Sequence, residues 1–488
     1  MLAPGKKNRF SGDLFLLSSQ VIFLICGYGI QVIITRFLSP TDYGTWGVLT
    51  AVLVWFELTI ISGFPKGVTK FIAESPLIEQ DEVFFRSYLV QLLVGLVLGA
   101  VLFGVAHPLA ALWDTADLRL LLQISALDIP LYGLYFENMA VLNGKHQFRK
   151  MFFLQAFYSI AKLTLIIVLV ASGFGLEGAA WGNVLASLAA CLVSQTFVGL
   201  PKIPAQKNFY ISRLIAFCIP STLFVVLFAL IQRADFLMLK TLTSLPRILG
   251  FYWAAQLLAR VPYFLIEGTS KKLFSLLSES YGHKDWQTAR ISFSEYMHLT
   301  FLIFGLVVSV TLGCANDIIL LLFPKDYEQI AHVLRILIVV NSLTALMYIF
   351  SQVLFSVSQE KKALGGVSLL VLLSGTLCWI LIPWKGEYGA AGAALITFFL
   401  GSVLFYRLLP TQLKGGFDIR FTAKLLIAGT LTVIIGWILP TGTIPLILLK
   451  LTAVTLLYAL SLFALREPMA LSAIRMLRRR NFYEDASE

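Results

Sequence analysis

Five basic residues lie inside long apolar segments, where a charged side chain is costly. A charge in a membrane-spanning segment costs roughly 2.5–3.5 kcal/mol on insertion scales, so five such charges facing lipid would cost about 12–17 kcal/mol. Each is therefore expected to have a partner or a water-filled surface. The five residues are Lys162, Arg233, Arg260, Arg335 and Lys450.

Two of the arginines are candidates for binding an anion, because a guanidinium can hold two oxygens at once. Arg260 lies about ten residues into its segment, or ~15 Å deep at 1.5 Å per residue, and Arg233 lies ~10 Å deep by the same rise. Structural alternatives exist for both. Arg260 could pair with Glu267 on the same helix face, and Arg233 could pair with Asp235 or extend to the interface.

The other three cations differ in position. Lys162 lies near the middle of its segment and is a third candidate for an anion-binding surface. Arg335 is a fourth, although it lies near a segment end. Lys450 is expected to pack or to extend its ammonium group to the interface.

Acidic residues in apolar segments could take up protons or sodium ions. Asp128 and Glu137 are the main candidates, and Pro130 should loosen the backbone beside Asp128. The alternative is an ion pair with a cation of the same helical bundle. Glu57 and Glu295 also lie in apolar segments, closer to the expected inner surface.

Gln20, Gly27 and Gln31 are spaced seven and four residues apart in the first apolar segment. This spacing places them on one helix face, which favours a polar cavity wall. Close helix packing through Gly27 is the alternative. Pro220 and Pro262 are expected to bend two later helices.

The composition explains why the positioning elements must be membrane helices. Of the 488 residues, 58% are hydrophobic and 13% are charged, and the mean hydropathy is +0.83. A soluble domain needs about 25% charged residues. The chain is therefore expected to be an all-α integral membrane protein. Its five cysteines lie in apolar segments and should be core residues without disulfides.

Apolar segments of about 20 residues predict fourteen spans. The predicted spans are Phe10–Phe37, Tyr43–Ser62, Phe85–Ala106, Leu118–Val141, Met151–Ser172, Leu176–Leu200, Ile211–Lys240, Leu249–Ser278, Ile291–Leu312, Ile330–Val357, Ala363–Pro383, Tyr388–Leu408, Ile419–Leu439 and Ile444–Leu465.

Basic residues concentrate in alternate loops, which sets the orientation. With the N-terminus in the cytoplasm, most of the 38 Lys and Arg residues fall on the inner side. Both termini are then cytoplasmic. The basic tail, residues 466–488, is expected to anchor the chain against anionic lipid. The net charge of +11 reflects these loops, and nucleic-acid binding is not expected.

An internal repeat divides the first twelve spans. Gly178-Ala179-Ala180 resembles Gly389-Ala390-Ala391, 211 residues later, and residues 144–150 resemble residues 358–362. Residues 36–44 resemble residues 240–250 in the same way. The repeat predicts a lobe over residues 10–200, a second lobe over residues 211–408 and an additional helix pair over residues 419–465. Two similar bundles would face each other across a cavity.

The segments Arg36–Val48 (RFLSPTDYGTWGV) and Val68–Ser75 (VTKFIAES) resemble the polysaccharide-export flippases of the multidrug/oligosaccharidyl-lipid/polysaccharide superfamily, which include O-antigen and lipid II flippases. Further similarity lies around Asp235, Gly250 and Asp326-Tyr327, so the resemblance covers most of the chain between residues 10 and 400.

The resemblance implies a transporter in the cytoplasmic (inner) membrane. It implies that a lipid-linked oligosaccharide, usually undecaprenyl-diphosphate-linked, moves from the inner to the outer leaflet by alternating access. Membrane lipids, a polysaccharide polymerase and glycosyltransferases are the expected partners. No cofactor or metal is expected.

Two alternatives remain. One is an ion-coupled multidrug or metabolite efflux transporter of the same superfamily, whose cavity should be acidic and aromatic. The other is a membrane polysaccharide polymerase or ligase, which usually carries a sizeable outer loop. No predicted loop exceeds roughly 20 residues, and neither a Walker loop nor an HExxH motif occurs in the sequence, so an enzyme is not expected.

Overall fold

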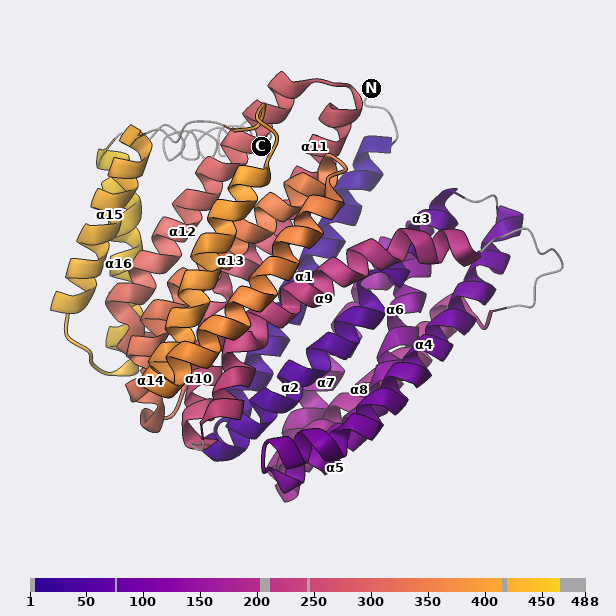
Figure 1. Cartoon of the computed structure of the whole chain (residues 1–488), viewed down its shortest axis with the longest axis horizontal. Helices are drawn as coiled ribbons and strands as arrows, with labels where there is room; N and C mark the ends of the chain where they lie inside the picture. The colour runs from indigo at the N-terminus through magenta and orange to yellow at the C-terminus, as the bar shows by residue number, and fades with distance from the viewer. Residues whose placement is uncertain (1–4, 75–76, 202–210, 244–245, 415–418, 466–488) are drawn as a thin grey trace, which may run out of the picture. The chain divides into compact units, whose positions relative to one another are not determined.

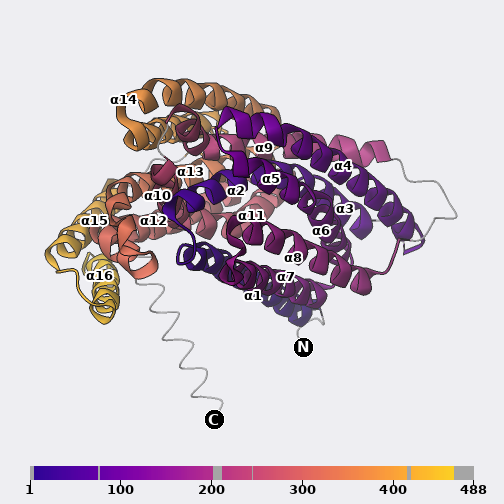
Figure 2. The same ribbon diagram turned by 90° about the horizontal axis from the view of Figure 1, so that it is seen from below.

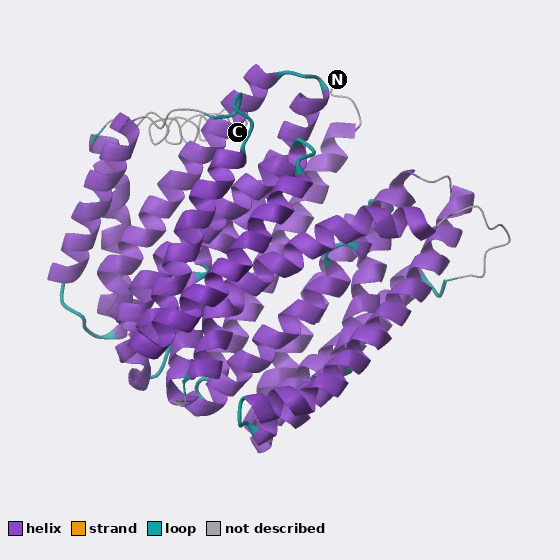
Figure 3. Cartoon of the chain, viewed as in Figure 1, coloured by secondary structure: helices purple, strands orange, loops and turns teal. Residues whose placement is uncertain are grey.

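The computed structural model describes residues 5–74, 77–201, 211–243, 246–414 and 419–465. Within these ranges every regular element is helical, and loops are short (Figure 3). This confirms the predicted all-α fold. The expected tail anchor, residues 466–488, lies outside the described residues.

The chain forms two compact units, and the first comprises residues 1–253. Its α7 and α8 are joined through a π-helical turn at Val170–Phe174, and they pack side by side in both ribbon views (Figures 1 and 2). The helices of this unit are α1 (Gly5–Ile34), α2 (Pro40–Ile61), α3 (Phe64–Glu74), α4 (Leu77–Leu112), α5 (Ala116–Ala126), α6 (Asp128–Gly144), α7 (Phe148–Leu169), α8 (Gly175–Val198), α9 (Ile211–Leu242) and the first part of α10 (Pro246–Ala259).

The second unit comprises residues 254–488. Helices α15 and α16 pack against each other and against α12 (Figures 1 and 2). A short 3-10 turn over Lys325–Ile330 precedes α13. The helices are the end of α10, α11 (Val261–Gly282), α12 (Trp286–Leu322), α13 (Ala331–Ser356), α14 (Glu360–Leu408), α15 (Ile419–Ile438) and α16 (Ile444–Ala464).

Each of the fourteen predicted spans falls on a helix or on a broken pair of helices. In the described ranges, nine helical segments are long and apolar enough to cross a membrane. The segment over Phe148–Val198 has 51 residues and that over Glu360–Leu408 has 49. A helix needs only about 20 residues to cross once, so each of these is long enough for two crossings. The chain is a multi-pass membrane protein.

Large apolar side chains are exposed on the outer faces of these helices, which is expected where a helix faces lipid rather than water. Leu372 of α14 is 71% exposed and Leu449 of α16 is 65% exposed. All five cysteines are buried and free, which confirms that they are core residues.

Two spans are interrupted where the sequence places a proline near the middle. Helix α5 ends at Ala126 and α6 begins at Asp128, two residues before Pro130. Helix α10 ends at Ala259 and α11 begins at Val261, with Pro262 in its first turn. Proline lacks the N–H that would continue the helical bonding, which accounts for both breaks.

The backbone conformation of equivalent turns supports the internal repeat. Gly175 has φ 52° and ψ −133°, and Gly386, 211 residues later, has φ 56° and ψ −129°. His146 and Ser358, which follow α6 and α13, have φ of 54° and 57°. Positive φ is uncommon outside glycine, so its recurrence at the repeat spacing is specific. The two compact units, however, divide after Trp253 because α9 packs on α2 and α3.

Candidate functional site

A group of charged side chains lies among helices α2, α7 and α9 of the first unit. Lys162 of α7 and Arg233 of α9 both interact electrostatically with the carboxyl group of Glu57 on α2. Arg233 is buried, and Lys162 and Glu57 are partly buried. In the described residues, neither Lys162 nor Glu57 forms an ion pair shorter than 4 Å. Lys162 and Glu57 are therefore close enough to interact electrostatically, and each could still contact a ligand.

Asp128 is the fourth charged member of this group. The α5–α6 break places it at the start of α6, where it is fully buried. Its carboxyl group interacts electrostatically with Lys162 and Glu57 and faces Asn183 and Ser187 of α8. Neither carboxylate oxygen makes a hydrogen bond within the described residues. A buried carboxylate without hydrogen bonds is costly unless it binds a proton or a cation.

A cluster of tyrosines lies beside Lys162, which contacts one of them directly. The Lys162 ammonium donates to the hydroxyl of Tyr158, one turn earlier on α7, over 3.4 Å, and lies 5.6 Å from the centre of its ring. The ring of Tyr158 lies 5.6 Å from that of Tyr132 and 5.1 Å from that of Tyr135. This aromatic wall stabilises the cation by cation–π attraction without neutralising it.

Arg233 lies over the indole of Trp253, with 4.9 Å between its guanidinium carbon and the ring centre. The Trp253 indole N–H donates to the Gln31 side-chain oxygen over 3.4 Å. The same oxygen accepts from Trp46 and Tyr43 of α2, at 3.3 Å each. Gln31 therefore connects α1 and α2 to the residue that orients Arg233. Asp235, the alternative partner from the sequence, accepts from the Tyr252 hydroxyl over 2.6 Å.

The polar face of α1 is not a close packing surface at its glycine. A Cβ added to Gly27 would meet no heavy atom within 4 Å, so the close-packing alternative is wrong. Gln20 is partly buried, and its neighbour Ser19 donates to Gln155 of α7 over 3.0 Å. This arrangement is compatible with the predicted polar wall.

Glu137 lies in a separate buried group on α6. It accepts a hydrogen bond from Ser87 of α4, while its second oxygen makes none within the described ranges. The adjacent Asn138 donates to Ser194 and to Gln195 of α8. Glu137 thus has a hydroxyl partner within hydrogen-bond geometry, whereas the Ser187 hydroxyl beside Asp128 lies outside that geometry.

The two remaining cation candidates belong to the second unit. Arg335 of α13 donates to the Leu312 carbonyl over 3.1 Å and to Asn316 over 3.4 Å. Its guanidinium therefore braces α13 against α12. Arg260 lies at the break between α10 and α11, where its carbonyl accepts from Phe264 N–H and its side chain is partly buried.

Sequence reasoning missed Asn183, Ser187 and Tyr158 as members of the site. Asn183 and Ser187 are four residues apart and follow Gly178-Ala179-Ala180, so the spacing does predict a shared face. Small residues let α8 approach α7 closely: a Cβ on Gly182 would lie 2.8 Å from Ile166. That approach brings the two polar side chains to Asp128.

Together the group holds two cations, Lys162 and Arg233, and two carboxyl groups, Glu57 and Asp128. Their charges cancel when all four are ionised. Protonation of either carboxyl group would leave a net positive charge, and an anionic group could then bind to Lys162 and Arg233.

The sequence matches one family model, and the structure is similar to those of known membrane transporters. A family model described as "Polysaccharide biosynthesis protein" matches residues 33–332. No curated protein matches the sequence. The structure is similar to the lipid II flippase MurJ in an inward closed conformation, at a TM-score of 0.74 and 14% identity, covering 93% of this chain and 98% of that one. It is also similar to an inward-facing multidrug resistance MATE transporter of the MOP superfamily, at a TM-score of 0.65 and 14% identity, covering 80% and 94%.

Proposed function

Because the chain belongs to the polysaccharide biosynthesis protein family, we propose that it is a flippase for a lipid-linked oligosaccharide. In this proposal it moves the substrate from the inner to the outer leaflet of the cytoplasmic membrane, with both termini in the cytoplasm. The substrate is undecaprenyl-diphosphate-linked. The polymerase and glycosyltransferases of the same pathway are its functional partners.

The observation that carries the proposal is the combination of this family with buried or partly buried cations in membrane helices. The fold similarity extends over nearly the whole length of a lipid II flippase, whose named substrate is lipid-linked. A diphosphate presents several anionic oxygens, which Arg binds in pairs and Lys binds as a point charge. Lys162 and Arg233 are the cations that we assign to this role, with Arg260 as a further candidate. Arg335 is the least suited of the four, since its donors are engaged.

Asp128 is the coupling residue that we propose. Protonation of Asp128 would release Lys162 from its electrostatic interaction and so favour binding of the diphosphate. Loss of the proton would restore the charge balance and expel the anion. Gln20 and Gln31 would line the path beside this group.

The proposal is tested by deleting the gene in its native host and measuring lipid-linked oligosaccharides in each leaflet, together with surface polysaccharide. We expect accumulation in the inner leaflet and loss of surface polysaccharide. An impermeant reagent that modifies sugars on the outer leaflet gives the distribution directly. Normal surface polysaccharide with unchanged leaflet distribution would contradict the flippase function.

The second candidate, an ion-coupled efflux transporter, is favoured by one observation. Glu57, Asp128 and the tyrosines around Lys162 supply acidic and aromatic groups that suit a cationic drug. Raised drug sensitivity of the deletion strain, with normal surface polysaccharide, would support efflux instead.

Asp128→Asn should remove the response of transport to a pH gradient. In vesicles with the purified chain and a fluorescent lipid-linked oligosaccharide, an imposed gradient should accelerate flipping by the unsubstituted protein. We expect about a tenfold loss of that acceleration, equivalent to ~1.4 kcal/mol of coupling. Flipping without a gradient should persist, because asparagine keeps the size of the side chain.

Glu137→Gln is the matched control, since Glu137 is also a buried carboxyl group of α6. It should keep the response to the gradient. If Glu137→Gln loses that response and Asp128→Asn keeps it, the coupling role belongs to Glu137.

A further inference from the structure

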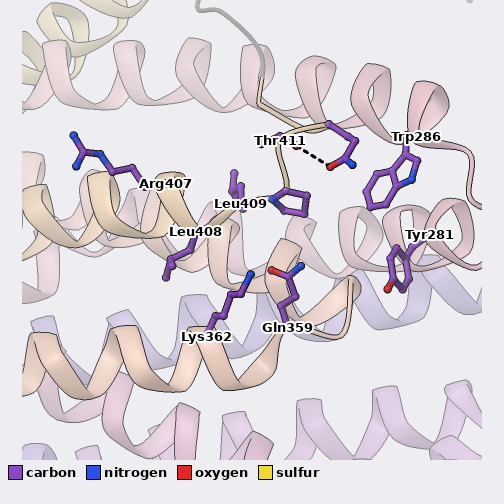
Figure 4. A pocket seen from close by; sticks show the side chains of 10 residues that line it. Tyr281, Trp286, Gln359, Lys362, Arg407, Leu408, Leu409 and Thr411 are labelled. Carbon is purple, nitrogen blue, oxygen red and sulfur yellow. Dashed lines mark hydrogen bonds between the residues drawn. The ribbon is translucent and has the colours of Figure 1, made fainter.

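A cavity of about 440 Å³ opens in the second unit (Figure 4). Three segments form it: the turn between α11 and α12, the turn between α13 and α14, and the end of α14 with the residues that follow. Its lining includes Tyr281, Trp286, Gln359, Lys362, Arg407 and Thr411.

The three segments all follow even-numbered spans of the predicted order. They therefore lie at the same membrane surface, which is the inner one if the N-terminus is cytoplasmic. In Figure 4, Lys362 and Gln359 extend toward the Leu409–Thr411 segment, and Tyr281 and Trp286 lie at one end. Arg407 lies at the opposite end with its guanidinium directed away from Lys362. The cavity thus belongs to the zone where apolar helices meet the lipid headgroups.

The charge of this cavity is positive. Lys362 and Arg407 are both exposed, and none of the ten described residues that line the cavity is acidic. Lys414 adds a third cation nearby, where its ammonium donates to the Arg407 carbonyl over 2.7 Å. A basic pocket between helix ends at the inner surface is suited to a phosphate-bearing headgroup.

Other groups in the cavity wall further restrict the chemical class of ligand that could bind. The side-chain oxygen of Gln359 is buried and makes no hydrogen bond within the described residues, so an acceptor is left for a hydroxyl donor. Tyr281 and Trp286 stack edge to face, with 5.7 Å between ring centres. Such aromatic rings are enriched at headgroup depth. Leu408 contributes apolar surface beside the cations.

We propose that this cavity binds an anionic phospholipid with a hydroxyl-bearing headgroup, such as phosphatidylglycerol. The phosphate contacts Lys362, while Arg407 and Lys414 add positive charge at the same helix ends. A headgroup hydroxyl donates to Gln359, and the acyl chains extend along the apolar helix surface into the bilayer. None of the described residues that line this cavity belongs to the candidate transport site, so this inference does not rest on the flippase proposal.

The test uses the full chain purified in detergent, with bound lipids counted by native mass spectrometry. The probes are phosphatidylglycerol, phosphatidylcholine and phosphatidate, with sn-glycerol 3-phosphate as the lipid-free phosphate ester. Phosphatidylglycerol should bind at least about tenfold more tightly than phosphatidylcholine. The double variant Lys362→Gln/Arg407→Gln should lose that preference. Both positions are exposed, so its melting temperature without added lipid should stay unchanged.

Two variants make the result specific. Lys145→Gln/Arg149→Gln removes the same charge from another exposed turn and should keep the preference for phosphatidylglycerol. Gln359→Leu should retain binding but lose the preference for phosphatidylglycerol over phosphatidate, which lacks the hydroxyls.

Three outcomes would overturn the proposal. Equal binding of phosphatidylglycerol and phosphatidylcholine would show that the negative charge of the headgroup does not determine binding. An equal loss in the Lys145→Gln/Arg149→Gln control would assign the effect to net charge. Binding of sn-glycerol 3-phosphate as tight as that of phosphatidylglycerol would assign the cavity to a soluble phosphate ester.

Discussion

Lys450→Met is expected to lower the free energy of unfolding by about 3–5 kcal/mol, because it leaves a buried carboxylate without its partner. The Lys450 ammonium lies 2.7 Å from Asp317 of α12 and donates to the Leu439 carbonyl over 2.8 Å. Lys450 is 7% exposed and Asp317 is 2% exposed. Water cannot replace the lost contacts at such a position.

The pair is expected to have a large effect because it joins α16 directly to α12 at a buried position. These two helices pack chiefly on α12. Lipid chains are as apolar as the helix side chains, so the hydrophobic effect does not drive helices together in a bilayer. Close packing and polar contacts determine their association instead. The packing is close at Gly313 and Gly436, where a Cβ on Gly436 would lie 2.9 Å from Gly313. Trp437 and Tyr458 add hydrogen bonds to α12, from the indole to the Leu312 carbonyl over 3.0 Å and from the hydroxyl to the Leu302 carbonyl over 3.1 Å.

Thermal melting of the purified protein, with protease sensitivity of the α15–α16 turn, measures the effect. The double variant Lys450→Met/Asp317→Leu should recover most of the lost stability, since a buried pair can often be replaced by apolar residues without loss. Lys145→Met is the control for a lysine at an exposed turn. A surface substitution away from buried partners is expected to change stability by less than about 0.5 kcal/mol. Equal effects of Lys450→Met and Lys145→Met would contradict the role of the buried pair.

The role of Asp317 was not predicted from the sequence. The ninth span was predicted to end at Leu312, whereas α12 continues to Leu322 and carries Asp317 inside the helix. Its partner lies 133 residues later, so no local spacing connects them. Lys450 was expected to pack or to extend to the interface. The structure shows that it packs, and that an ion pair is the reason.

The spans and their breaks, in contrast, follow from local properties. Hydropathy depends only on a window of about 20 residues, and Pro130 and Pro262 act on the backbone beside them. The turns at Gly175 and Gly386 could be predicted because the internal repeat is found by comparing the two halves of the sequence. The cavity beside Lys362 could not be predicted from the sequence, because it forms where three turns that are distant in the sequence meet.

The candidate transport site was predictable only in part. Lys162, Arg233 and Asp128 stood out because a charge in an apolar segment needs a reason. That they share the first unit with Glu57 depends on how α2, α6, α7 and α9 pack, which charge and hydropathy do not encode. Arg335 illustrates the opposite case, since an equally conspicuous arginine braces two helices.

Arg233→Gln is expected to reduce the flipping rate roughly 100-fold. Two charge-assisted hydrogen bonds to a diphosphate contribute about 1.5–3 kcal/mol each, so losing them costs at least ~3 kcal/mol. Arg233→Lys should give an intermediate rate, because lysine keeps the charge but neither binds two oxygens nor stacks on Trp253 as a planar group. The measurement is flipping of a fluorescent lipid-linked oligosaccharide in vesicles, with the melting temperature of each variant measured in parallel.

Arg335→Gln is the matched control, because the guanidinium of Arg335 bonds to Leu312 and Asn316. It should lower the melting temperature and leave the flipping rate of the folded protein within about threefold, less than 1 kcal/mol. A second variant, Arg233→Gln/Glu57→Gln, separates a substrate role from a structural one. Removing Glu57 restores the charge balance of the group, so stability should recover while the rate stays low. If the rate recovers as well, Arg233 serves only to neutralise Glu57, and the diphosphate must bind elsewhere.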